Sequence, residues 1–267
     1  MHQSLTEDIR EMFTEQVHYR ELLWQMTRRD LLLRYKQTIM GFGWAVFMPL
    51  LNTLIFTIVF TRVAKLETDL PYPLFSYCGL VAWNFFASSL RFAVSSLTAN
   101  MTLVTKVYFP REIFPFSSVL VSLVDMGVAC IILVLMMAYY RVMPGHTIVA
   151  LPLVLLVHFA FTTGMSLVLA MANVFYRDVK YLFEVILMLW MFASAVVYPV
   201  KDIGGWLGVA LQLNPMTPII EAYRAVLLMN TWPEPRTFAM ATVISLTTLA
   251  IGWVMFHRNE FRFAEIV

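Results

Sequence analysis

Charged residues are scarce in this chain. Asp, Glu, Lys and Arg make up 13% of its 267 residues, and hydrophobic residues make up 60%. A typical soluble domain has about 25% charged and about 45–50% apolar residues. This balance excludes an ordinary soluble domain and indicates a protein embedded in lipid. The net charge of +2 is too small to suggest a nucleic-acid partner.

Sequence motifs for nucleotide, metal and redox chemistry are also absent. The chain has no G-x-x-x-x-G-K-[ST] loop for ATP phosphates, no H-E-x-x-H and no C-x-x-C. Cys78 and Cys130 fall in apolar stretches, so we expect unpaired core residues. We therefore predict no catalytic residue, metal site or cofactor on this chain. A membrane enzyme acting on polyprenyl lipids, which would need paired acidic residues or a metal, stays an alternative.

Long uncharged stretches dominate what is present. A helix needs roughly 20 apolar residues to cross a bilayer, and in hydrocarbon only helices or closed barrels satisfy their own backbone hydrogen bonds. We predict an all-α polytopic membrane protein with six transmembrane helices in residues 40–257, an N-terminal region 1–39 and a tail 258–267. The uncharged stretches are residues 41–61, 71–90, 113–140 (interrupted by Asp125), 142–176, 185–200 and 237–257.

Two features interrupt these stretches. Helix breakers are dense in residues 201–230, which favours short helices that dip part-way into the membrane over one clean span; they include Gly204, Gly205, Pro215 and Pro218. Asp125 would cost about 2.5–3.5 kcal/mol at a helix centre. We expect a structural hydrogen bond there, because a proton relay would need a chain of such groups.

The distribution of basic residues predicts the orientation. With six spans both termini share one side, and that side holds the larger number of Lys and Arg residues, which places it in the cytoplasm of an inner (plasma) membrane. The connection 101–114, between the second and third spans, is then cytoplasmic. The basic residues on that side are Arg28, Arg29, Arg34, Lys36, Lys106, Arg111, Arg177, Lys180, Arg258 and Arg262.

An amphipathic helix is predicted before the first span. Tyr19, Leu22, Leu23 and Met26 follow the i, i+3, i+4, i+7 spacing of one helix face. Such a helix either lies on the membrane surface, its basic residues reaching lipid phosphates, or packs on a partner.

Aromatic residues are frequent within the spans. Aromatic faces can stack on the C–H faces of sugar rings without a fixed hydrogen-bond pattern, which would suit a sliding sugar chain. The alternative is ordinary packing in a membrane core and at its interfaces. The candidates for lining a channel are Trp44, Phe47, Phe56, Trp83, Phe86, Trp190, Phe192 and Tyr198.

Five segments together resemble one known family. They are "RDLLLRYKQTIMGFGWAVFMPLLNTLIFTIVF", "PYPLFSYCGLVAWNFFASSL", "LVTKVYFPREIFPFSSVL", "NVFYRDVKYLFEVILMLWMFASAVVYP" and "LNPMTPIIEAYRAVLL". They are similar to the membrane subunit of type-2 ABC polysaccharide exporters, the group with the O-antigen (Wzm-type) and teichoic acid permeases. The resemblance implies a homodimer, a separate cytoplasmic ATPase that binds ATP and Mg, and outward movement of a lipid-linked polysaccharide. It also implies re-entrant helices on the outward side.

The resemblance further implies that the segment from Val104 to Glu112 contains the helix that couples to the ATPase. The composition agrees, because Tyr108 and Phe109 supply a buried anchor and Lys106, Arg111 and Glu112 a polar rim. The full segment is Val104, Thr105, Lys106, Val107, Tyr108, Phe109, Pro110, Arg111 and Glu112.

The chain departs from the family pattern at two positions. Ala82 and Ala195 stand where prolines are usual, which affects how the second and fifth helices bend. A capsular polysaccharide exporter, a teichoic acid exporter, and a channel or secondary carrier without an ATPase stay open as alternatives.

Overall fold

The computed structural model describes residues 14–15, 17–36, 38–63, 70–106, 109–199, 204–260 and 263. Within these ranges every regular element is a helix. Val107 and Tyr108 of the predicted coupling segment lie outside the described residues.

The helices follow the uncharged stretches of the sequence. Each of the six stretches forms a helix, and two are extended by irregular turns, the π-helix η1 after α3 and the 3-10 helix η2 before α7. The elements are α2 (Arg20–Tyr35), α3 (Gly43–Thr57), η1 (Ile58–Val63), α4 (Tyr72–Ala99), α5 (Met101–Lys106), α6 (Ile113–Tyr139), η2 (His146–Ala150), α7 (Leu151–Phe175), α8 (Val179–Phe192), α9 (Gly205–Leu213), α10 (Met216–Arg224), η3 (Ala225–Met229) and α11 (Pro235–Asn259).

Four of the described helices are long and apolar enough to cross a membrane. These are Gly43–Arg62, Ile113–Tyr139, His146–Phe175 and Pro235–Asn259. They confirm an all-helical polytopic membrane protein. α4 is the longest single α-helix at 28 residues, but it carries Asn84, Ser88 and Arg91, and α8 has only 14 residues.

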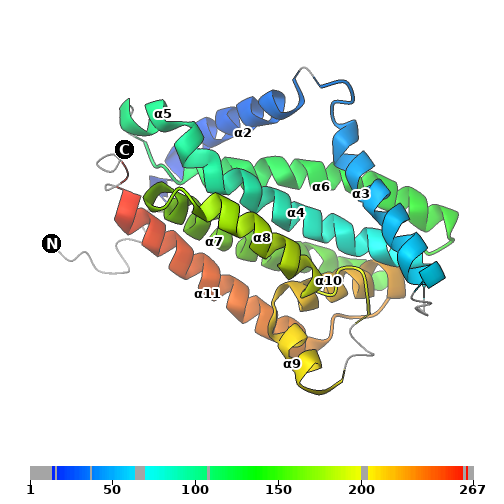
Figure 1. Cartoon of the computed structure of the whole chain (residues 1–267). Helices are drawn as coiled ribbons and strands as arrows, with labels where there is room; N and C mark the ends of the chain where they lie inside the picture. Colours follow the sequence, from blue (N-terminus) through cyan, green and yellow to red (C-terminus); the bar gives the residue numbers. More distant parts are fainter. Residues whose placement is uncertain are drawn as a thin grey trace.

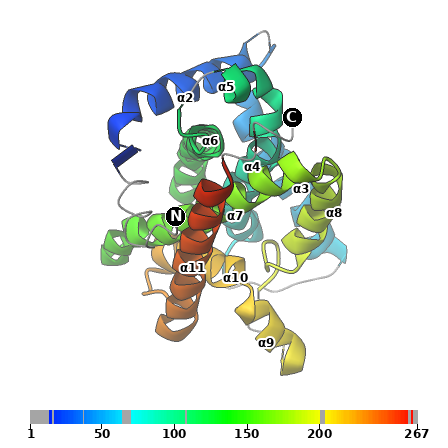
Figure 2. The same ribbon diagram turned by 90° about the vertical axis from the view of Figure 1, so that its left-hand side faces the viewer.

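The bundle is built around α4. This helix is buried along most of its length and contacts α3, α6, α7, α8 and α10. α2, α5 and the end of α11 lie at one end of the bundle, and α9 lies toward the other (Figure 1). Figure 2 looks along the bundle and shows α2 passing across α6, with α3 and α8 on the opposite side.

α7 and α11 pack unusually closely. A Cβ atom on Gly164 would lie 2.6 Å from the backbone nitrogen of Leu249, and one on Gly252 would lie 2.6 Å from the carbonyl oxygen of Gly164. Only glycine permits this approach, and small residues serve the same purpose at other helix contacts in membranes. The two backbones therefore touch directly.

A buried arginine holds the chain after α8. Arg224 is fully buried, donates to the carbonyl oxygens of Ala195 and Val196, and pairs with Glu221 at 2.7 Å. Its guanidinium also lies 3.6 Å from the centre of the Phe75 ring. Ala195 has a φ of 50°, which the fixed φ of proline forbids. The backbone of this turn therefore cannot accommodate a proline at position 195, where the family that the chain resembles usually has one.

Candidate functional site

An ion pair fixes α2 to α6. The carboxylate of Asp125 accepts hydrogen bonds from the Arg34 guanidinium and the Tyr35 hydroxyl. Arg34 also lies 3.6 Å from the centre of the Phe92 ring. Burial, and then the neighbouring Asp125 carboxylate, raise the pKa of Tyr35, so its hydroxyl stays protonated and donates. The structural role predicted for Asp125 is confirmed.

The apolar face predicted for α2 is confirmed as well. Tyr19, Leu22, Leu23 and Met26 pack on a cluster at the end of the bundle that includes Phe114. The opposite face is exposed and mixes apolar with basic side chains: Trp24, Leu32, Arg20 and Arg28. α2 thus packs on its own subunit, and its outer face has the composition of a membrane-surface helix.

The predicted coupling segment begins in α5, directly after α4. Asn100 joins this region together: its Nδ2 donates to the carbonyl oxygen of Ser96 at 2.8 Å, and its Oδ1 accepts from Arg29 of α2 at 2.9 Å. Thr105 and Lys106 are exposed, whereas Val104 is buried. α5 therefore presents a small polar surface at the end of the bundle.

The second half of the segment turns back into the subunit. Phe109 and Pro110 are buried, and the Phe109 ring centre lies 5.6 Å from that of Phe114. Glu112 is fully buried: its Oε2 accepts a 2.7 Å hydrogen bond from Nε1 of Trp253, and its Oε1 lies 3.2 Å from Nδ1 of His257.

These contacts correct two placements inferred from the sequence. Phe109 was expected in an anchor for a partner and Glu112 in a polar rim, but both side chains find their contacts inside the subunit. Apolar side chains on α4, α7 and α11 make burial of Phe109 more favourable than exposure. The hydrogen bonds to Trp253 and His257 offset the cost of burying the Glu112 carboxylate. The coupling role of the segment stays a prediction, carried in the described residues by Thr105, Lys106 and the half-buried Arg111.

Arg111 ties the same segment to the residue after α11. Its guanidinium donates to the carbonyl oxygen of Glu260. Burial raises the pKa of the Glu260 side chain to about 7, and its Oε2 has no hydrogen-bond partner among the described residues. Trp253, His257 and Glu260 were missed in the sequence. The signal that could have found them is weak: Trp253 and His257, four residues apart, share one face at the end of an apolar span.

The predicted channel aromatics fall into two groups. Trp83 and Phe86 are 4% and 0% exposed, and the Phe86 ring centre lies 5.2 Å from Trp190 and 5.4 Å from Phe161. The structure therefore places Trp83 and Phe86 in the core of α4, α7 and α8, where they cannot line a path. This corrects the sequence interpretation, which could not tell the two faces of α4 apart.

The second group is exposed or half-buried. Trp44 and Phe47 are 43% and 42% exposed on α3, with ring centres 5.7 Å apart. Phe192 is exposed at the end of α8, and Phe56, Trp190 and Tyr198 are half-buried. Among the eight candidates, Trp44, Phe47 and Phe192 are thus open to a ligand or to a second subunit.

A polar cavity lies beside Trp44. It has a volume of about 160 Å³ between α3, α4 and α6. Its polar lining includes Asn84, Ser88 and Arg91, which follow one face of α4. Arg91 donates from Nε to Glu184 of α8 at 3.0 Å. This polar line was not recognised in the sequence, although its i, i+4, i+7 spacing is visible there.

Comparison with known protein families decides the identity of this arrangement. Residues 21–228 match the family described as ABC-2 type transporter. The chain belongs to the ABC-2 type transporter family. It is a membrane subunit for transport, and the ATPase of such transporters is a separate protein.

Several proteins similar to this ABC-2 subunit are named as exporters or transporters of a polysaccharide. The chain is 30% identical over 263 residues to the O-antigen export system permease protein RfbA of Myxococcus xanthus, covering 97% of this chain and 98% of that protein. It is 28% identical over 248 residues to a protein of the same name from Klebsiella pneumoniae, covering 92% and 95%. The polysialic acid transport protein KpsM of Escherichia coli is 19% identical over 234 residues, covering 87% and 91%.

Proposed function

We propose that this chain is the permease subunit of an ABC exporter that moves an O-antigen-like, lipid-linked polysaccharide outward across the inner membrane. One observation carries the proposal: the 30% identity to an O-antigen export permease extends over 97% of the chain. A separate ATPase subunit would bind ATP and Mg and supply the energy. No cofactor is needed on this chain itself.

We propose six spans with both termini in the cytoplasm. At about 1.5 Å per residue, the 28 residues of α4 extend roughly 42 Å, enough to cross a hydrocarbon core of about 30 Å. α8 completes its crossing with the chain that follows it, and α9 and α10 form the outward re-entrant pair. The common position of α2, α5 and the end of α11 supports this topology (Figure 1).

We propose a homodimer that uses α3 as an intersubunit surface. Only 11% of the Gly43–Arg62 window is buried inside the subunit. The exposed rings of Trp44, Phe47 and Phe192 would then stack on sugars, and Asn84, Ser88 and Arg91 would offer hydrogen bonds to sugar hydroxyl groups. Each stacking contact would contribute roughly 1 kcal/mol, weak enough for the glycan to move on.

A capsular polysaccharide is the second candidate cargo, because a polysialic acid transport protein is also a relative. The lower identity of 19% favours O-antigen over this alternative. A teichoic acid is the third. Membership of the transporter family favours an exporter over an enzyme that processes polyprenyl lipids.

The decisive experiment combines genetics with co-purification. Deleting the gene in its native host should abolish surface O-antigen and leave lipid-linked glycan inside the cell, and the tagged chain should co-purify with a P-loop ATPase. Normal O-antigen together with a loss of capsule would show instead that the cargo is a capsular polysaccharide. An absence of any ATPase partner would overturn the exporter assignment.

Labelling of introduced cysteines tests the orientation. Impermeant reagents should reach cysteines at Arg141 and Arg236 in intact spheroplasts, and should reach those at Lys106 and Arg177 only after lysis. The reverse pattern would overturn the topology and the coupling role of α5 together.

A further inference from the structure

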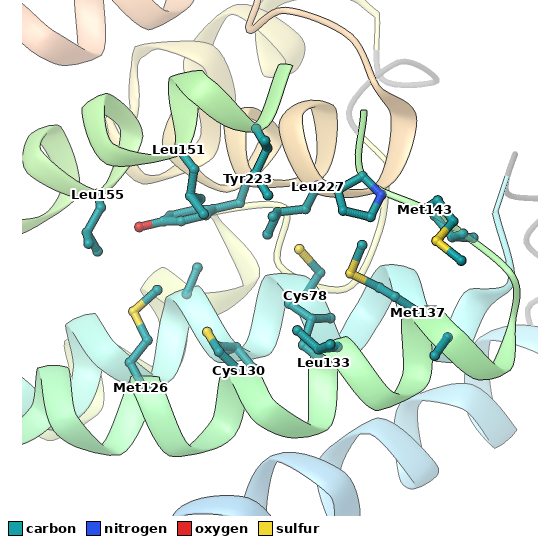
Figure 3. A pocket seen from close by; sticks show the side chains of 18 of the residues that line it. Cys78, Met126, Cys130, Leu133, Met137, Met143, Leu151, Leu155, Tyr223 and Leu227 are labelled. Atoms are coloured by element: carbon teal, nitrogen blue, oxygen red, sulfur yellow. The ribbon is translucent and has the colours of Figure 1, made fainter. Parts of the chain in front are cut away.

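An apolar cavity adjoins the polar cavity beside Trp44, with which it shares the lining residues Val81 and Met126. Its volume is about 520 Å³, and it lies between α4, α6, α7 and α10. Figure 3 shows Met126, Cys130 and Met137 of α6 facing Leu155, Tyr223 and Leu227 across the cavity. Apart from two thiols and the hydroxyl of Tyr223, its lining side chains are apolar.

The mouth of this cavity is bordered by exposed apolar side chains. Val134 is 62% exposed and Met143 is 80% exposed, and both line the cavity. Ile131 and Leu135 continue the exposed apolar surface along α6. Since α6 is long and apolar enough to span the bilayer, this surface faces hydrocarbon and the cavity opens to lipid chains.

A cavity of this kind does not stay empty next to a bilayer. An apolar cavity of about 150 Å³ in a protein interior stays dry and binds benzene. This cavity is more than three times larger, and it adjoins a phase of free hydrocarbon chains. Met126, Met137 and Met143 supply flexible, polarizable side chains that adapt to an irregular guest. The guest that fits is one hydrocarbon chain.

A cation lies where the head group of such a guest would be. Arg141 directly precedes the lining residue Val142, is exposed, and has no carboxylate partner among the described residues. Tyr139 and Tyr140 stand beside it, in the position of residues that mark the membrane interface. A guanidinium with free donors pairs well with a phosphate.

We infer that this cavity holds one acyl chain of an anionic phospholipid, with the phosphate of that lipid at Arg141. The carrier lipid of a glycan has to leave with its cargo, whereas neither α3 nor α8, which carry the exposed aromatic residues, contributes a residue to this cavity; α6 also packs on the side of α4 away from α8 (Figure 2). The occupant is therefore a resident lipid and not the transported one. The inference rests on the placement of α6 in the membrane and is independent of the cargo.

The resident chain has a mechanical role. Tyr223 and Leu227, at the end of α10 and in η3, line the cavity opposite α6. With the chain in place, the broken segment after α8 packs on α6 through hydrocarbon. Without it, this side of α10 loses its packing, so the stability of the complex should depend on phospholipid.

Photo-crosslinking of the whole complex tests the proposal. The probe is phosphatidylglycerol with a diazirine near the end of one acyl chain, in nanodiscs that hold the permease and its ATPase. Crosslinks should map to the lining of α6 and α7. Gly127 lines the cavity and a Cβ there meets no atom within 4 Å, so Gly127→Leu fills space while Gly127→Ala leaves most of it. We expect at least a fivefold loss of crosslinks in the first variant and no loss in the second.

Two further experiments distinguish a resident phospholipid from the polyprenyl carrier lipid as the occupant of the cavity. Arg141→Gln should lower crosslinking by phosphatidylglycerol at least threefold. Arg236→Gln changes an exposed arginine of α11, a helix that contributes no residue to the cavity lining, and should not lower it. Polyprenyl phosphate added at equal concentration should not compete. Competition by polyprenyl phosphate, or crosslinks unchanged by Gly127→Leu, would overturn the proposal. If Gly127→Leu reduces the folded complex, Ala138→Phe at the mouth makes the same test.

Discussion

The indole of Trp253, near the end of α11, donates a 2.7 Å hydrogen bond to the carboxylate of Glu112, the residue immediately before α6. These two residues are separated by 141 positions in the sequence. The bond connects the segment predicted to meet the ATPase with the last span. A movement of that segment would therefore displace α11 or break this hydrogen bond.

Replacing Glu112 should destabilise the permease and weaken coupling. Glu112→Ala removes the acceptor of the hydrogen bonds from the half-buried Trp253 and the buried His257, at a cost of about 1–3 kcal/mol for each group left unsatisfied. We expect a lower melting temperature and less glycan exported per ATP hydrolysed. Glu184→Gln is the matched control, because the Arg91–Glu184 pair is half exposed and such pairs contribute about 0–1 kcal/mol. Equal effects of both variants would contradict the prediction.

The Arg34–Asp125 pair should behave as a unit. Removing one partner of a buried pair leaves an uncompensated charge and costs about 3–5 kcal/mol. Arg34→Met and Asp125→Leu should each lower the folded fraction strongly, and the double variant should recover much of the loss. Thermal unfolding of all four proteins gives the coupling energy. Additive losses would show that the two side chains stabilise the protein independently.

The stability of the permease should depend on pH through Glu260. Burial raises its pKa from 4.5 to about 7, so the unfolded state holds fewer protons than the folded state between these values. The contribution of Glu260 to the free energy of unfolding therefore falls as the pH rises from 4.5 to 7 and is constant above pH 7. Glu260→Gln should match the wild type at pH 4.5 and exceed it at pH 8, by about 3 kcal/mol at most.

Glu234 provides a control of opposite sign. Its pKa is lowered by hydrogen bonds from the side chain and backbone of Thr237. The stabilisation that Glu234 provides is present above pH 4.5 and is lost as the pH falls through its lowered pKa. Glu234→Gln should thus be less stable than the wild type at pH 7 and equal to it in acid. Parallel pH profiles of both variants would contradict these assignments.

Lys106 should matter for the ATPase and not for folding. The side chain is exposed at the end of α5. Lys106→Glu should reduce co-purification of the ATPase several-fold with an unchanged melting temperature. Lys180→Glu changes another exposed lysine, at the start of α8, and should have a smaller effect. The prediction fails if both variants retain the ATPase.

The exposed and buried aromatic residues should respond differently to replacement by leucine. Trp44→Leu and Phe47→Leu should lower export per folded complex, because each replacement removes an aromatic ring that would stack on a sugar. Trp83→Leu and Phe86→Leu should instead lower the amount of folded complex, because they leave cavities in the core. Glycan export and folded protein are measured on the same membranes. Wild-type export by the first pair would exclude sugar stacking on α3.

The spans were predictable because runs of apolar residues are local in sequence. The face of each span was not, and Trp83 and Phe86 show why: their burial depends on α7 and α8, which lie some 70 or more residues away. Glu112 was placed on a surface for the same reason, since Trp253 and His257 lie at the other end of the chain. The φ of Ala195 depends on the distant Arg224.

The glycine contact between α7 and α11 has a mechanical meaning. Helices that touch backbone to backbone at Gly164 and Gly252 have no layer of side chains between them to absorb a displacement. In the proposed topology, α11 would receive force at its cytoplasmic end through Trp253 and would pass it to α7, which adjoins η2 at its opposite end and also contacts α10. The pair would then move as one rigid unit and transmit a displacement from one side of the bilayer to the other.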